Sequence, residues 1–401
     1  MVKLLHIAGN SKFGGGGIII CRLAAMAEQM GWRVDVLTTD PIFQQKLRQQ
    51  ETGVIALDVI RREIRPLRDL KGLFQLWWFL IHNRYDIVHT HTSKGGFVGR
   101  LAARAAGVRT IIHTAHGFAF HEESPPMTRR LYTMLERIAA HACDRIVTVS
   151  EYHRRWGIEL GIADLRKLVA IPNSISSDRV KPDRDRESVR RELGIGANLR
   201  MLLTIGRLAE EKGLDDLLHA ARLIARDSEA QFKIVFAGSG PLALSLPKTA
   251  TELGIQDRVL FLGFRRNIGD LLAASDIVVL PSLREGLSIS LLEAMAAAKP
   301  IVTTTIGSNL EATRNGTAAL LVPPRNADAL ANAILKLFLD GSLRQSVAQS
   351  AKEISDKCYT EERMLEGYRA QYLQLCNRVR FAYRPKRAAT DGGDKLRGGS
   401  P

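Results

Sequence analysis

The chain of 401 residues is longer than one ordinary hydrophobic core, so two domains are expected. Its composition, 45% hydrophobic and 25% charged, is globular, and its net charge of +15 favours an anionic partner such as a nucleotide phosphate, a lipid headgroup or nucleic acid. The longest aromatic-rich apolar run, "LWWFLI" at 76–81, is far shorter than the roughly 20 residues of a membrane span.

The opening of the chain and its cysteines bear on the compartment. Residues 3–9, "KLLHIAG", indicate a first strand and not the charged and then apolar leader of an exported protein. The four cysteines, at 21, 143, 358 and 376, form no CxxC pair of the metal-binding kind, which fits reduced thiols. We therefore expect a cytoplasmic protein.

Short β-branched runs alternate with helical stretches along the chain. In the first half, strands are predicted at 4–8, 33–39, 86–92, 110–116, 145–150 and 168–173. In the second half, they are predicted at 201–207, 232–238, 259–264, 276–282, 300–305 and 319–324. Because these runs are apolar on both faces, they are typical of parallel βαβ sheets. The predicted fold class is α/β, with two Rossmann-like parallel sheets facing a cleft.

The polar, charge-dense stretch between the two sets is the expected hinge. Ligands of open parallel sheets bind beyond the carboxyl ends of the strands, so the loops after the strands are the places to search for a site. The predicted division is an amino-terminal domain at 1–178, a hinge at 179–200, a carboxy-terminal domain at 201–358, a helix at 359–383 returning towards the amino-terminal domain, and a basic, disordered tail at 384–401.

Three of these loops favour a phosphate-bearing ligand. Glycines 14–17 lead into the first predicted helix and leave its backbone amides uncovered, although a flexible turn is the plainer interpretation. Arg207 and Lys212 flank the turn that opens another helix and could grip a diphosphate, unless Glu210 and Glu211 neutralise them at the surface. The next loop offers Gly238 for close ligand approach.

Two glutamates, Glu285 and Glu293, stand eight positions apart in "REGLSISLLEAMAAAKP". If both were helical, they would lie about 12 Å apart along the axis, which is too far for the paired carboxyls of a glycoside hydrolase. The spacing suits two contacts along one extended ligand. The amides of residues 286–288 would face an anion between these contacts.

The motifs "GRLAEEKG", "GSGP" and "REGLSISLLEAMAAAKPIV", in that order and after those strands, resemble the GT-B-fold retaining glycosyltransferases of family four, whose signature is E-x7-E. In the amino half, "DIVHTHTSKGGFVGRLAARAAGVRTIIHTAHGFAFHE" is similar to members that build lipid-linked or exported bacterial polysaccharides. The likeness extends to about residue 380.

The resemblance implies a role for each matched position. Arg207 and Lys212 would hold the donor diphosphate, Glu293 the ribose hydroxyls, and Glu285 the donor sugar. His116 would lie at the reaction centre, and the glycines that include Gly15 and Gly16 would close over the donor phosphate. The implied catalytic residues are His116 and Glu285, and the implied donor-binding residues are Gly15, Gly16, Arg207, Lys212, Gly238, Gly286, Leu287, Ser288 and Glu293.

The chain departs from the family pattern at several positions. The usual G-F-G after the first glutamate is Gly286-Leu287-Ser288 here, so the fit of the sugar is in doubt. The family implies no metal and no cofactor beyond the nucleotide-sugar substrate. Asp183 and Asp185 spell D-x-D, but they lie in the hinge and are interpreted as solvated surface.

The predicted function is a metal-independent, retaining glycosyltransferase. It would move a sugar from a nucleotide-diphosphate donor, with UDP the favoured nucleotide, to a polyprenyl-diphosphate-linked or oligosaccharide acceptor in bacterial cell-surface polysaccharide (exopolysaccharide) synthesis. One alternative is a non-hydrolysing sugar-nucleotide epimerase, which shares the two-domain architecture. Another is a basic nucleic-acid-binding protein, which the 6% aromatic content disfavours, so nucleic acid is not an expected partner.

A lipid-linked acceptor would require docking at the inner face of the plasma membrane. The favoured surface is residues 61–79, with the cations Arg61, Arg62, Arg65, Arg68 and Lys71. These precede an apolar cluster predicted on one helical face, Leu70, Leu73, Phe74, Trp77 and Trp78. Packing of the same residues against the sheet is the competing interpretation, and the basic tail from Arg378 is the second candidate surface.

Overall fold

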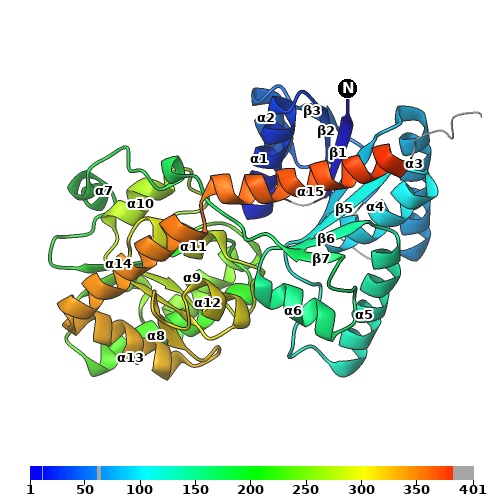
Figure 1. Ribbon diagram of the computed structural model, residues 1–401. Helices are drawn as coiled ribbons and strands as arrows, with labels where there is room; N and C mark the ends of the chain where they lie inside the picture. Colours follow the sequence, from blue (N-terminus) through cyan, green and yellow to red (C-terminus); the bar gives the residue numbers. More distant parts are fainter. Residues whose placement is uncertain (11, 61–64, 383–401) are drawn as a thin grey trace, which may run out of the picture.

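The computed structural model describes residues 1–10, 12–60 and 65–382 of the chain. Figure 1 shows two lobes, each built around its own sheet, and a long helix that runs from the second lobe back across the first. The predicted tail at 384–401 and the cations Arg61 and Arg62 lie outside the described residues. No helix within the described ranges is long and apolar enough to cross a membrane.

The first sheet is parallel and has the order β3-β2-β1-β4-β5-β6-β7. Its strands are β1 (Lys3–Gly9), β2 (Arg33–Thr38), β3 (Gly53–Ile55), β4 (Ile87–His91), β5 (Thr110–Ala115), β6 (Arg145–Thr148) and β7 (Leu168–Ala170). The prediction of six strands missed β3, an edge strand that begins with Gly53, a residue type that is depleted in strands.

The helices that follow its strands cover this sheet on both faces (Figure 1). They are α1 (Gly15–Gln29), α2 (Pro41–Gln49), α3 (Pro66–Asn83), α4 (Ser93–Ala105), α5 (Pro126–His141) and α6 (Glu151–Glu159). Polar side chains fix several of their starts: Asp40, Thr92 and Ser150 accept from the amides of Phe43, Gly95 and His153 at helix amino termini. Helices α3, α4 and α5 pack on the same face, whose core includes Leu76, Val98 and Ala140.

The second sheet is also parallel and has the order β10-β9-β8-β11-β12-β13. Its strands are β8 (Arg200–Ile205), β9 (Phe232–Ala237), β10 (Val259–Phe261), β11 (Ile277–Leu280), β12 (Ile301–Thr304) and β13 (Leu320–Val322). All six correspond to the predicted runs. In both sheets, the central strands are almost fully buried, as their continuous apolar sequences require.

The helices of the second half are α7 (Arg186–Glu192), α8 (Leu214–Asp227), α9 (Ser245–Glu252), α10 (Ile268–Ala274), α11 (Ile289–Ala296), α12 (Gly307–Ala312), α13 (Ala327–Leu339), α14 (Gly341–Cys358) and α15 (Glu361–Ala382). Within the predicted hinge, α7 packs on α10. Arg186 and Arg190 of α7 pair with the carboxylate of Asp276 at 2.7 and 3.2 Å. Much of this charge-dense stretch is therefore anchored to the second sheet.

The carboxy-terminal helix α15 joins the two halves by lying across the first one (Figure 1). It packs against α1 and places Tyr368 and Tyr372, both buried, in the core of the first half. The hydroxyl of Tyr368 lies 3.1 Å from Thr114 Oγ1, and that of Tyr372 lies 2.7 Å from His89 Nδ1. Burying two hydroxyls is tolerated because each one finds a hydrogen-bond partner.

Candidate active site

The loop after β8 and the loop after β11 enclose a small pocket in the second half. Its lining includes Gly206, Arg207, Lys212, Pro281 and Ser282. Arg207 follows the carboxyl end of β8, and Lys212 ends a short 3-10 turn, η2 (Glu210–Lys212), that leads into α8. The two cations predicted to hold a diphosphate therefore border one concave surface.

Lys212 and Glu285 form an ion pair in which Lys212 Nζ donates to Glu285 Oε1. Ser282 Oγ donates to the same carboxylate oxygen at 2.9 Å. Arg207 instead pairs with Glu211 at 3.3 Å. The surface pairing considered from the sequence thus exists for Arg207, whereas Lys212 points to a glutamate of the E-x7-E signature.

Glu293 lies inside α11, while Glu285 precedes that helix. The Glu293 side chain is 1% exposed, and Arg179 donates to its Oε1. Burial raises the pKa of Glu293, and the positive charges of Arg179 and Lys212 oppose that rise. The two ion pairs, Lys212–Glu285 and Arg179–Glu293, therefore form one charged group around the start of α11.

The departure from the family pattern at Leu287 has a structural explanation. The Leu287 side chain is 4% exposed and belongs to the apolar core of the second half. Its carbonyl accepts from Asn173 Nδ2 of the first half at 3.1 Å. Ser288 caps α11 by accepting from the Leu291 amide. The side chain at 287 thus points into the protein core.

The two halves meet where His116 and Gly286 lie against each other. A Cβ built on Gly286 would stand 1.8 Å from the carbonyl oxygen of His116, so only glycine fits there. A Cβ on Gly15 would come within 2.9 Å of Ile289 at the start of α11, and one on Gly16 would stand 3.8 Å from the His116 ring. The structure therefore brings Gly15, Gly16, His116 and Gly286 together at one contact between the lobes.

Gly238 was predicted to allow close approach of a ligand, and the structure gives a packing reason for a glycine at this position. A Cβ there would stand 1.7 Å from the carbonyl oxygen of Gly206. The packing of the two loops that follow β8 and β9 therefore accounts for this glycine.

Arg179 and Asn173 are site residues that the sequence analysis missed. Arg179 belongs to the segment between the halves and Asn173 to the end of the first half, and both reach across to α11 or its amino-terminal entry. Arg179 ends a short turn, η1 (Ser177–Arg179), in the charge-dense stretch that was interpreted as the hinge. The nearby Asp183 and Asp185 are exposed, as expected, and Asp185 caps α7 by accepting from the Ser188 amide at 2.8 Å.

Two parallel sheets whose strand ends meet across a contact, with a helix returning from the second to the first, define the GT-B fold class. Solved structures support this class. The chain superposes on Anabaena Alr3699/HepE, solved in complex with UDP and glucose, with a TM-score of 0.79 over 93% of this chain and 100% of that one, at 23% identity.

Sequence comparison identifies the family. Residues 13–179 match Glycosyltransferase Family 4, and residues 185–354 match Glycosyl transferases group 1. The Escherichia coli UDP-Gal:alpha-D-GlcNAc-diphosphoundecaprenol alpha-1,3-galactosyltransferase is 32% identical over 282 residues, 70% of this chain and 73% of that protein. A Corynebacterium aurimucosum D-inositol 3-phosphate glycosyltransferase is 28% identical over 373 residues, 86% and 88% of the two chains. The chain belongs to glycosyltransferase family 4.

This membership decides between the functions considered from the sequence. The protein is a glycosyltransferase, and neither the epimerase nor the nucleic-acid-binding alternative is supported. The names of the two relatives describe different acceptors, a lipid diphosphate sugar and an inositol phosphate. The family therefore fixes the type of reaction and leaves the substrates to be argued from the site.

Proposed function

We propose that the protein is a retaining, metal-independent glycosyltransferase that moves a sugar from a UDP-sugar to a polyprenyl-diphosphate-linked glycan in cell-surface polysaccharide synthesis. The observation that carries the proposal is the pair of ion pairs, Lys212–Glu285 and Arg179–Glu293, beside the contact between His116 and Gly286. The relative that uses UDP-Gal and a diphosphoundecaprenol acceptor, and the fold neighbour that holds UDP and glucose, support the choice of substrates.

In this proposal, the donor binds along the start of α11. Arg207 and Lys212 take its diphosphate, and Glu293 accepts hydrogen bonds from the ribose hydroxyls. Glu285 contacts the sugar together with the amides of residues 286–288. Since Glu293 is buried and paired with Arg179, the arriving ribose must either share that carboxylate with the guanidinium or displace it.

The chemistry that follows is transfer with front-face attack. The bond between the anomeric carbon and the diphosphate oxygen breaks, and the acceptor hydroxyl attacks from the same face. The leaving phosphate oxygen takes the proton of that hydroxyl. Arg207, Lys212 and the amides at the start of α11 stabilise the charge that develops on the diphosphate. His116 touches the sugar from the opposite lobe.

The decisive experiment measures nucleotide release. Purified protein would be incubated with UDP-sugars, with and without a short polyprenyl-diphosphate-linked sugar. We expect UDP to appear only in the presence of the acceptor, and the anomeric configuration of the new bond to match that of the donor. The Glu293→Gln variant serves as control for contaminating activity. Release that ignores the acceptor, or inversion at the anomeric carbon, would contradict the proposal.

The membrane-docking surface predicted on residues 61–79 is only partly exposed in the structure. Leu73 and Trp77, placed in the apolar cluster from their spacing, are half-buried partners of the core. Leu70, Phe74 and Trp78 of the predicted cluster are exposed and belong to an apolar stripe on α3 with spacings of three and four residues. Its members are Leu67, Leu70, Phe74, Trp78 and Ile81.

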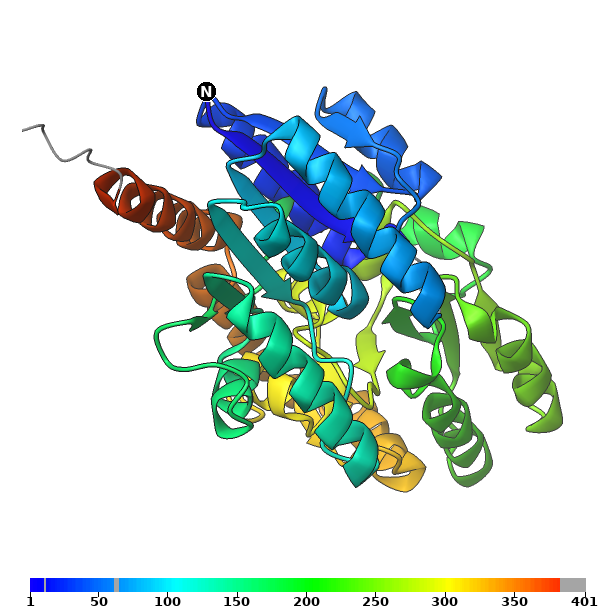
Figure 2. The same cartoon turned by 90° about the vertical axis from the view of Figure 1, so that its right-hand side faces the viewer.

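We propose that this stripe docks on an anionic phospholipid leaflet, where the lipid-linked acceptor resides. Trp78 is 55% exposed and Phe74 60% exposed, an unusual cost for side chains that face only water. Arg68 and Lys71 of the same helix are exposed and complement the charge of such a leaflet. Helix α5 carries a second stripe, Met127, Leu131, Met134 and Ile138, and it flanks α4 opposite α3 on one face of the first half (Figure 2).

Sedimentation with vesicles tests this surface. Wild type should pellet with vesicles that contain phosphatidylglycerol. The Phe74→Ser/Trp78→Ser variant should bind these vesicles at least tenfold less, because it lacks the two aromatic side chains that would be buried in the leaflet. Leu339→Ser is the control, since Leu339 is an apolar side chain of α13 in the other half that is even more exposed. Equal pelleting of the α3 variant and this control would remove α3 as the docking surface.

A further inference from the structure

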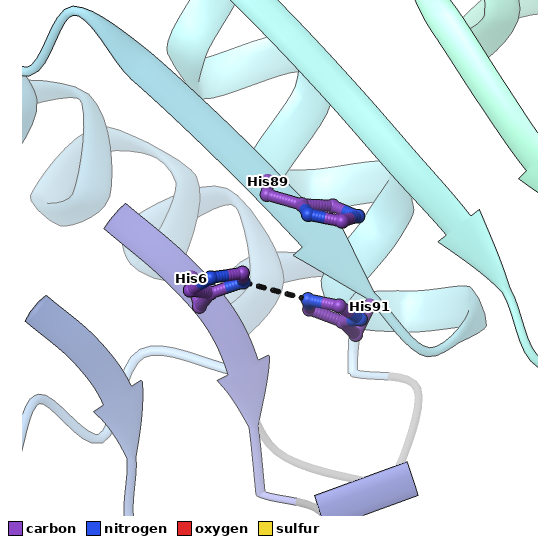
Figure 3. A group of neighbouring side chains, drawn as sticks. All are labelled: His6, His89 and His91. Atoms are coloured by element: carbon purple, nitrogen blue, oxygen red, sulfur yellow. Dashed lines mark hydrogen bonds between the residues drawn. The ribbon is translucent and has the colours of Figure 1, made fainter. Parts of the chain in front are cut away.

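A group of histidines fills the core of the first half beneath α15. His6 of β1 lies beside His89 and His91 of β4, and all three are buried (Figure 3). A nitrogen from each lies within 4.8 Å of the others, which is the spacing of a candidate metal site. The group therefore needs an explanation that the donor site does not supply.

The orientation of the rings disfavours a metal. His89 and His91 are stacked, with ring centroids 4.3 Å apart and planes inclined by 30° (Figure 3). Because the lone pair of an imidazole lies in the plane of its ring, stacked rings do not converge on one ion. Both nitrogens of His89 are also engaged already, by Tyr372 at 2.7 Å and by Thr114 at 2.8 Å.

The remaining contacts form a chain that ends at the site. His6 Nδ1 lies 3.0 Å from His91 Nε2, and His91 Nδ1 lies 3.2 Å from His116 Nε2. Burial lowers the pKa of His6 to about 3 and that of His116 to about 4, and it also holds the pKa of His91 well below its usual value. The three rings are therefore neutral, so each carries one N–H and must donate on one side and accept on the other.

Only two proton arrangements satisfy both hydrogen bonds. In one, each Nδ1 carries the proton, so that His6 donates to His91, His91 donates to His116, and His116 keeps an Nδ1–H. In the other, each Nε2 carries it, and every donor points the opposite way. His6 Nε2 is buried and has no partner among the described residues. The second arrangement would bury an N–H without an acceptor, which is rarer in proteins than an acceptor without a donor.

We propose that His6 and His91 are positioning residues that fix the tautomer of His116, so that its Nε2 is held by His91 and its Nδ1–H is offered at the contact between the lobes. The inference rests on the proposed role of His116 beside the donor sugar. In addition, His6, a buried residue in the middle of β1 that makes none of the proposed substrate contacts, determines which ring donates in the hydrogen bond between His91 and His116.

The test combines a matched set of variants. His6→Leu removes the donor to His91, whereas His6→Asn keeps an amide N–H near the former Nδ1. His113→Leu is the control, because His113 is a buried histidine whose Nδ1 lies 3.0 Å from Thr90 Oγ1, on the opposite face of the sheet. A circular dichroism melt confirms that each variant is folded before use.

The first readout is the imidazole ¹⁵N spectrum of the substrate-free protein, which reports the tautomer without any enzyme assay. We expect His116 to be protonated at Nδ1 in wild type, in His6→Asn and in His113→Leu, and to lose that preference in His6→Leu. Protonation of wild-type His116 at Nε2, an unchanged spectrum in His6→Leu, or binding of one equivalent of Zn²⁺ by the histidines would overturn the inference.

The second readout is turnover. We expect His6→Leu to lower kcat about tenfold, as one misdirected hydrogen bond does, with the Kd of UDP unchanged and with activity recovered in His6→Asn. An equal loss in His6→Leu and His6→Asn would overturn the inference while leaving the proposed function intact. A protein with the expected spectra that transfers no sugar would overturn the function and not the histidine chain.

Discussion

Arg179, which ends the last turn before the second half begins, holds the buried carboxylate of Glu293 at the start of the proposed donor site. This contact joins the segment between the lobes to the residue that is proposed to take the ribose. A buried carboxylate left without its cation is costly, so the pair cannot be broken freely. Nucleotide binding and the position of this segment are therefore expected to depend on each other.

The Arg179–Glu293 pair predicts losses of UDP affinity that differ in size between its two members. Glu293→Gln should weaken UDP binding by about a hundredfold, because it removes the acceptor for the ribose hydroxyls. Arg179→Gln should disturb UDP binding far less, because the ribose hydroxyls can then satisfy the carboxylate. Isothermal titration with UDP checks both values. Equal losses in the two variants would mean that Arg179 itself contacts the nucleotide.

The Lys212–Glu285 pair predicts strong coupling. Lys212→Ala should lower kcat/KM by about a hundredfold or more, since it removes a cation from the diphosphate and leaves Glu285 unpaired. Arg207 is more exposed than Lys212 and is paired with Glu211. The Arg207→Ala protein should therefore lose most of the wild-type activity, but less than the Lys212→Ala protein loses. In the Lys212→Ala/Glu285→Gln double variant, the loss should be smaller than the product of the single losses. Independent effects would show that the two side chains do not act on the same ligand.

The sequence predicted what depends on local pattern and missed what depends on tertiary contact. Twelve of the strands were recognised from their apolar runs, whereas β3, which begins with Gly53, was not. Glu285 and Glu293 could be singled out by their spacing. Arg179 contacts Glu293, which lies 114 positions away in the sequence. Helix α15 brings Tyr372 to His89, which lies 283 positions away. No pattern within one helix or strand encodes such a meeting.

Metal removal should leave activity intact. The proposed site provides two cations, Arg207 and Lys212, and the amino terminus of α11 for the leaving diphosphate. These groups supply the charge that Mg²⁺ supplies in other nucleotide enzymes. Protein dialysed against EDTA and assayed in EDTA should therefore turn over at the rate of untreated protein. Loss of turnover that Mg²⁺ or Mn²⁺ restores would contradict the assignment of the diphosphate to these side chains.

Stability should fall as the pH is lowered below the ordinary pKa of histidine. Burial, with neighbouring positive groups for some, lowers the pKa of a set of histidines: His6, His89, His91, His113, His116 and His153. A depressed folded-state pKa means that the unfolded chain binds these protons first, so the stability is present above about pH 6.5 and is lost as the pH falls towards 4. Each histidine contributes about 1.4 kcal/mol per pH unit across that window.

The variant that checks this is His6→Asn, which cannot take up the proton. Its melting temperature should lie below that of wild type at pH 7.5, and the two values should converge between pH 6.5 and 4.5. A curve parallel to that of wild type would place the acid sensitivity elsewhere.

The contact between Gly286 and His116 predicts a selective loss of transfer. In Gly286→Ala, the added methyl group would stand 1.8 Å from the His116 carbonyl oxygen, so the two lobes must separate locally to admit it. The phosphate and ribose contacts lie within the second half and at Arg179, so UDP should bind with nearly its wild-type Kd. Sugar transfer needs His116 beside the donor, and a displacement of about 1 Å at a reacting centre costs about a hundredfold in rate. Gly196→Ala is the control, because a Cβ at Gly196 meets open space and its backbone does not have the positive φ that would strain an alanine. We would measure UDP affinity by titration and turnover by UDP release for both proteins. Retention of full turnover in Gly286→Ala would show that the lobes do not need this contact during transfer, and loss of UDP binding would place the nucleotide nearer to His116 than the proposed site allows.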